Sequence, residues 1–110
     1  MSEEVERRFQ ELEKLSRDYA QAQALADHLS EFRKSKKAML MKAAETNGIN
    51  VSATQEREAY RHAEYVELLE GLRAATEEAL RLKWALNIAQ MRFEMWRTKQ
   101  ANKRAEMNLR

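Results

Sequence analysis

The chain has 110 residues, of which 44% are hydrophobic and 35% charged, with two glycines and no proline or cysteine. This composition excludes a disordered chain, a disulfide or thiolate–metal scaffold, and more than one domain of ordinary size. The net charge of +2 is too small to indicate nucleic-acid binding by itself. Strong helix formers predominate, so we expect an all-α protein whose residues 1–110 form a single domain.

The first predicted helix covers residues 3–46. Its apolar or small side chains recur at steps of three and four, which indicates one buried stripe. The helix should end at Asn47-Gly48, because both residue types accept the left-handed conformation that closes helices. The stripe passes through Lys36 and otherwise comprises Val5, Phe9, Leu12, Leu15, Tyr19, Ala22, Ala26, Leu29, Phe32, Met39 and Ala43.

Residues 47–63 are the predicted connector. Within it, the stretch from Ser52 to Gln55 matches a capping box, in which the first and fourth side chains satisfy N–H groups at a helix start. We therefore expect a short helix over residues 53–61 inside this connector.

The second long helix is predicted over residues 64–100, followed by a basic tail over residues 101–110. Its apolar positions alternate at steps of three and four without interruption, which is the heptad pattern of a coiled-coil seam. Beyond Lys99 this pattern is lost. The seam comprises Tyr65, Leu68, Leu72, Ala75, Ala79, Leu82, Leu86, Ala89, Phe93 and Trp96.

Charge blocks favour an antiparallel hairpin of the two long helices. Residues 1–13 hold five Glu and two Arg, whereas residues 92–110 hold six Lys or Arg and two Glu. Residues 31–42 hold five Lys or Arg and one Glu, whereas residues 56–78 hold seven Glu and three Arg. An antiparallel arrangement sets opposite charges side by side, and a parallel one sets like charges together.

Side-chain size predicts a register for this hairpin. Setting Phe32 opposite Ala75 and Tyr19 opposite Ala89 lets large residues meet small ones in successive layers, as dense packing prefers.

A second apolar face lies on the helix over 64–100, opposite the seam. One hairpin partner covers only one side of a helix, and soluble monomers rarely expose such a stripe. We expect homodimerisation into a four-helix bundle, or a higher homo-oligomer. The alternatives are a different protein partner, a connector folded over the face, and a membrane surface, which two narrow polar gutters disfavour. The face comprises Leu80, Trp84, Ile88, Met91 and Met95.

The sequence contains no pattern typical of catalysis. His28 and His62 lie on different segments without metal-ligand spacing, and no serine has a base at a suggestive spacing. There is no glycine-rich loop to hold phosphates. We therefore predict a non-enzymatic protein with no catalytic residues, cofactor, metal or small-molecule substrate. Its predicted function is structural or adaptor-like, through helix–helix protein interaction and self-association.

An accessory nucleic-acid-binding protein is the alternative function. Clustered Lys and Arg neutralise phosphates, giving a strongly salt-dependent affinity. The competing explanation is that these cations pair with the acidic blocks and lie at helix C-termini, where positive charge is favourable. The candidate contacts are Arg33, Lys34, Lys36, Lys37, Arg97, Lys99, Lys103 and Arg104.

The run YVELLEGLRAATEEALRLKWALNIAQMRFEMWRTKQANKRAE resembles small, uncharacterised all-helical proteins of tailed phages and prophages. The resemblance covers roughly the C-terminal half, and WRTKQANKRAE is its most recognisable piece. It implies a phage protein in the host cytoplasm, accessory to replication or recombination, and brings no catalytic residues. A cytoplasmic location also agrees with the acidic N-terminus, which lacks the apolar core of a signal peptide, and with the absence of a membrane-spanning apolar run.

Overall fold

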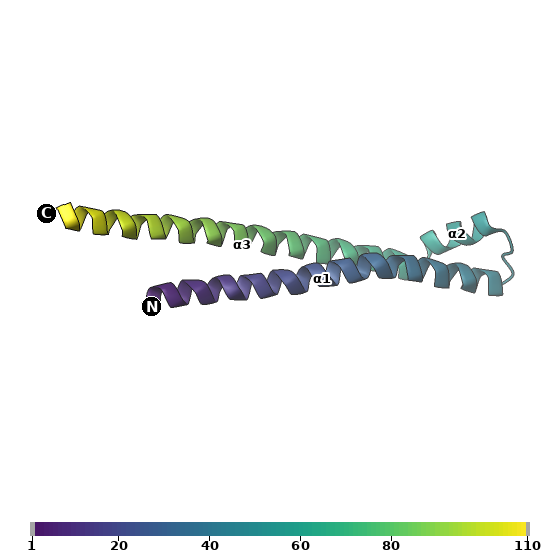
Figure 1. Cartoon of the computed structure of the whole chain (residues 1–110). Helices are drawn as coiled ribbons and strands as arrows, with labels where there is room; N and C mark the ends of the chain where they lie inside the picture. Colours follow the sequence, from purple (N-terminus) through teal and green to yellow (C-terminus); the bar gives the residue numbers. More distant parts are fainter. Residues whose placement is uncertain (1, 110) are drawn as a thin grey trace. The chain divides into compact units, whose positions relative to one another are not determined.

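The computed structural model of the protein describes residues 2–109, and all three secondary-structure elements among them are helices. In chain order these are α1 (Glu3–Thr46), α2 (Ser52–Arg61) and α3 (Ala63–Leu109), as Figure 1 shows. The predicted all-α class is confirmed for the described residues. α3 continues past residue 100, where a tail was expected, because residues 101–106 include the strong helix formers Ala, Lys, Arg and Glu.

The chain divides into two compact units, which we name by their position in the sequence. The terminal unit consists of the residues up to Ala20 together with those from Leu80 onward. The central unit is Gln21–Ala79. α1 and α3 each contribute a segment to both units, and the packing of each unit is described separately.

A Schellman motif ends α1. Gly48 has a φ of +97°, its N–H donates to the Glu45 carbonyl at 3.0 Å, and the Ile49 N–H donates to the Ala44 carbonyl at 3.0 Å. These two bonds satisfy carbonyls at the end of the helix that have no partner within it. The stop expected at Asn47-Gly48 is therefore present, and glycine supplies the left-handed conformation that it needs.

The capping box expected at the start of α2 is wrong. Val51 is the N-cap, in an extended conformation, and makes no side-chain capping bond, so Ser52 is already inside the helix. The Gln55 side chain instead donates from Nε2 to the Ile49 carbonyl at 2.8 Å. Gln55 thus fastens the connector to α2 rather than capping the helix.

His62 joins α2 to α3. Its N–H donates to the Ala59 carbonyl at 3.2 Å, and its Nδ1 accepts the Glu64 N–H at 3.1 Å. The imidazole thus satisfies one of the free N–H groups at the start of α3, a role more common for Ser, Thr, Asp or Asn.

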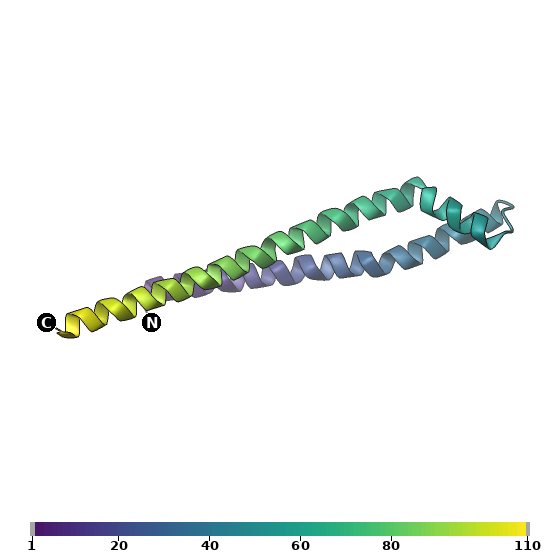
Figure 2. The same cartoon turned by 90° about the horizontal axis from the view of Figure 1, so that it is seen from above.

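The core of the central unit forms where the chain reverses direction through α2 (Figure 2). Leu40 of α1, Ala59 of α2 and Tyr65 of α3 are buried together, and Met41 packs against them. The rings of Tyr60 and Tyr65 meet edge to face, with centroids 5.4 Å apart. This cluster fixes α2 against both long helices.

Burial follows the predicted seam closely on α3 and only in part on α1. All ten seam positions of α3 are buried or partly buried. On α1, however, the predicted positions Phe9, Phe32, Met39 and Ala43 are exposed, whereas Leu40 and Ala44 are buried. The prediction for the last turns of α1 is wrong because α2 packs against the side of the helix that carries Leu40, one residue beyond the predicted position Met39.

In the terminal unit, the two helical segments run antiparallel. Phe9 of α1 packs against Phe93 of α3 with ring centroids 5.1 Å apart and ring planes inclined at 51°, and the Arg8 guanidinium lies 4.7 Å from the centroid of the Trp96 ring. The expected register would set Phe9 opposite Lys99 instead, so the true register differs by between one and two helical turns. That prediction relied on the alternation of large and small residues and did not consider contact between aromatic rings.

Candidate interaction surfaces

The apolar face predicted on α3 is open to solvent. Its five members have exposed fractions between 43% and 62%, whereas Leu82 and Phe93 on the other side of the same helix are 8% exposed. All five lie in the segment of α3 that belongs to the terminal unit. We call them the α3 stripe: Leu80, Trp84, Ile88, Met91 and Met95.

The terminal unit has a thin core of its own. Among its described residues, only Leu82 and Phe93 are buried. The α1 segment covers the seam side of α3 through Phe9 and Arg8, and it leaves the α3 stripe uncovered. Burial of apolar area is the main stabilising force in folding, and in this unit the apolar side chains of the α3 stripe remain in solvent.

The basic block of α1 is paired with acidic residues in the central unit. Lys37 Nζ donates to Glu56 Oε1 at 3.0 Å, and Lys36 Nζ lies 3.3 Å from Glu64 Oε2. Hydrogen bonds to Tyr60 and Glu56 raise the pKa of Lys37, and the hydrogen bond from Lys37 lowers the pKa of Glu56. These two cations, expected as nucleic-acid contacts, therefore act between helices.

The remaining two candidates on α1 also lie in the central unit. Lys34 Nζ lies 3.5 Å from Glu31 on the same helix, and Arg33 is partly buried. Three of the four predicted positions on α1 thus have an acidic partner.

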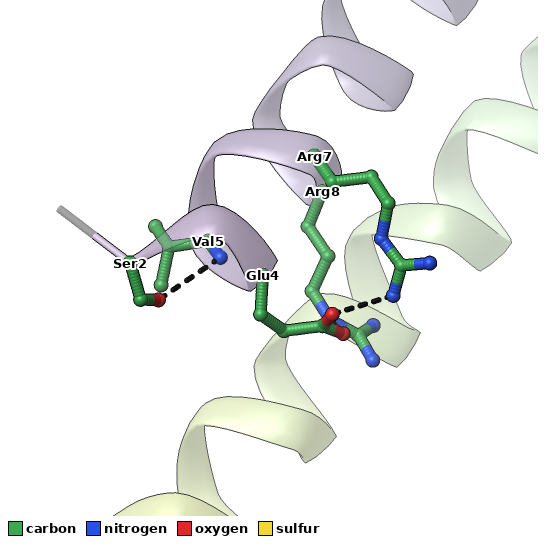
Figure 3. Close-up of polar contacts among 5 residues, drawn as sticks. All are labelled: Ser2, Glu4, Val5, Arg7 and Arg8. Carbon is green, nitrogen blue, oxygen red and sulfur yellow. Dashed lines mark hydrogen bonds and ion pairs between the residues drawn. The ribbon is translucent and has the colours of Figure 1, made fainter.

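The pairing of charge blocks expected in the terminal unit takes another form. Glu4 pairs with Arg7 and Arg8 on its own helix, the latter through Arg8 Nε at 2.8 Å (Figure 3). Arg97 likewise pairs with Glu94 within α3, at 3.5 Å. Among residues 2–109, no ion pair joins the acidic block of residues 1–13 to the basic block of residues 92–110. The cation–π contact of Arg8 with Trp96 links the two helices instead.

The basic residues near the end of α3 are divided between two sides of the helix. Arg97 and Arg104 line a hollow of about 570 Å³ that also contains Glu94 and begins near Ser2 and Val5. The Ser2 hydroxyl accepts the Val5 N–H at 3.3 Å and caps the start of α1 there (Figure 3).

A second hollow, of about 220 Å³, lies on the other side of α3. Its lining consists of Arg8, Arg92, Met95, Trp96 and Lys99. Lys103 is exposed one helical turn beyond Lys99. Of the predicted nucleic-acid contacts, the structure therefore brings Lys99 and Lys103 to one side and Arg97 and Arg104 to the other. Arg8 and Arg92 line the same hollow and were not among the predicted contacts, although the spacing of Arg92, Lys99 and Lys103 was available as a signal.

In the part of the chain that the structure describes, no three His, Cys, Asp or Glu side chains lie close enough together to hold a metal ion. His28 stacks on Phe32 with ring centroids 6.2 Å apart, and His62 caps α3. Likewise, no helix among the described residues is long and apolar enough to span a membrane.

Comparison with known proteins does not extend these observations. No protein family, no curated protein and no solved structure matches the chain.

Proposed function

We propose that the protein is a non-enzymatic structural or adaptor protein that acts through helix–helix contact and self-association. The observation that carries the proposal is the α3 stripe, which places Trp84, Ile88 and two methionines in solvent. Monomeric proteins rarely expose a contiguous apolar surface of this kind, and Trp and Met are typical of protein interfaces.

Stable protein–protein interfaces bury roughly 1,200–2,000 Å² in total. Two copies that pack their stripes together would give a four-helix bundle. Phage origin and a host-cytoplasmic location belong to the proposal as well, and the phage origin rests on the sequence resemblance alone.

The test is the substitution Trp84→Asp. Trp84 is 59% exposed, so the change leaves the helical packing within one chain intact and places a charge in the stripe. A two-fold interface contains the residue twice, and we expect the dissociation constant of the dimer to rise at least about 100-fold. Sedimentation velocity measures this shift, and circular dichroism checks that helix content is unchanged.

Gln90→Asp is the matched control. Gln90 is exposed on the same helix but lies outside the stripe, so this variant carries the same added charge and should keep the mass of the unmodified chain. If folded Trp84→Asp keeps that mass too, the stripe does not mediate assembly. If the unmodified chain is a monomer that binds a different protein through Trp84, the proposal of self-association is wrong and the proposal of an adaptor function stands.

A further inference from the structure

The smaller hollow of the terminal unit concentrates positive charge. Arg8 of α1 and Arg92 and Lys99 of α3 line it together with Trp96 and Met95, and its lining contains no acidic side chain. Among residues 2–109, neither Arg92 nor Lys99 forms an ion pair, and only Arg8 is partly compensated, by Glu4. Three cations that converge in this way repel one another, and an anion bound between them removes that repulsion.

Arg8 is held in place before any ligand arrives. Its Nε donates to Glu4 Oε1 at 2.8 Å, and its guanidinium lies 4.7 Å from the centroid of the Trp96 ring. Cation–π contact fixes the plane of the guanidinium, and the bond through Nε leaves the two terminal nitrogens for a ligand. A side chain that is already ordered loses less entropy on binding than a free one.

A row of basic side chains and one aromatic ring extends from the hollow along α3. Arg92, Trp96, Lys99 and Lys103 follow one another at steps of four, three and four, so they lie on one side of the helix over roughly 17 Å. A volume of about 220 Å³ is smaller than the roughly 300–1,000 Å³ of small-molecule sites, and it suits one group of a longer ligand. The arrangement therefore fits a chain of anions rather than a single compact molecule.

We propose that the Arg8–Arg92–Lys99 hollow, extended by Lys103, binds the phosphate backbone of a single-stranded nucleic acid. Tracks of cations with an aromatic residue among them are typical of proteins that bind single strands without sequence preference. The proposal goes beyond the adaptor function, because its residues differ from the α3 stripe except for Met95 at the margin.

Fluorescence anisotropy with a labelled oligothymidine of about 20 nucleotides tests the site on the full chain. Three or four phosphate contacts predict that log K falls with log salt at a slope of about −2 to −3 between roughly 50 and 200 mM. The double variant Arg92→Gln with Lys99→Gln should bind at least about tenfold more weakly, with a slope shallower by about 1.4.

Arg97→Gln with Arg104→Gln is the control, because it removes the same charge from the opposite side of α3, beside Glu94. Its affinity should stay within about threefold of the unmodified chain.

Equal losses in the two double variants would show that net charge alone drives binding, and the site would be rejected. Absence of binding at low salt, tighter binding to a duplex of the same length, or capture by phosphatidylserine vesicles but not by the oligonucleotide would each overturn the proposal. Light scattering on the same samples shows whether self-association is intact, so failure here is separable from failure of the adaptor function.

Discussion

Gly48 shows how one residue determines where α1 ends. Its φ of +97° lies in the region that side chains with a Cβ rarely adopt, and the Schellman bonds depend on it. A Cβ added there meets no atom within 4 Å, so strain in the backbone is the only cost. We expect Gly48→Ala to lower the free energy of unfolding by about 1–2 kcal/mol, measured by urea denaturation.

Gly71 is the natural comparison, because an added Cβ also meets nothing within 4 Å but the residue lies inside α3. Gly71→Ala should raise the free energy of unfolding by about 0.5–1 kcal/mol, since alanine loses less backbone entropy in a helix. If both variants shift stability in the same direction, the left-handed conformation of Gly48 is not what closes α1.

The Lys37–Glu56 pair gives the central unit a pH dependence. The hydrogen bond from Lys37 lowers the pKa of Glu56 below its ordinary value of 4.5. The stabilisation by Glu56 is therefore complete above that ordinary pKa and is lost as pH falls through the lower pKa of the folded state. Thermal unfolding between about pH 2 and pH 6 should show a smaller loss on acidification in Glu56→Gln than in the unmodified chain. Parallel profiles for the two proteins would contradict the role of this pair.

Single residues mark the limit of what the sequence predicts at this scale. The stop at Gly48 was predictable because few residues adopt its conformation. The roles of Ser52 and His62 were not, because a capping match over four residues does not say which residue becomes the N-cap. A shift of one residue in the helix start turns Ser52 from a cap into an ordinary helical residue.

Helix α1 shows the same limit at the scale of an element. The three- and four-residue periodicity predicts that the helix exists and how far it extends. The side that it buries near Leu40 depends instead on α2, a separate helix about which the periodicity of α1 carries no information. The stripe through Met39 and the alternative through Leu40 differ by one residue, and only the packing of Ala59 and Tyr65 decides between them. On α3 the predicted seam is the buried side, and Tyr65, which packs against α2, is itself a seam position.

Leu40 and Met39 allow a direct test of that assignment. Leu40 is 8% exposed inside the central core and Met39 is 56% exposed beside it. Leu40→Ala should cost about 2–3 kcal/mol of unfolding free energy through lost burial and a cavity, whereas Met39→Ala should change it by less than about 0.5 kcal/mol. Chemical denaturation compares the two, and a larger effect at Met39 would restore the side predicted from the sequence.

The whole molecule combines well-defined helices with little buried surface. Only nine of its described residues are buried hydrophobics, all polar side chains among them remain at least partly exposed, and the five apolar residues of the α3 stripe lie in solvent. The second apolar face was predictable from α3 alone, since its residues lie opposite the seam. What covers it was not, because the occupant of an exposed face is not encoded in the periodicity of the helix that carries it.

The most direct test of self-association is the solution mass measured by light scattering over a wide range of protein concentration. Self-association through the α3 stripe predicts a mass of twice 13.0 kDa, or a higher multiple, that falls toward 13.0 kDa only on strong dilution. A constant mass of 13.0 kDa at every concentration would show that the α3 stripe does not join copies of this chain.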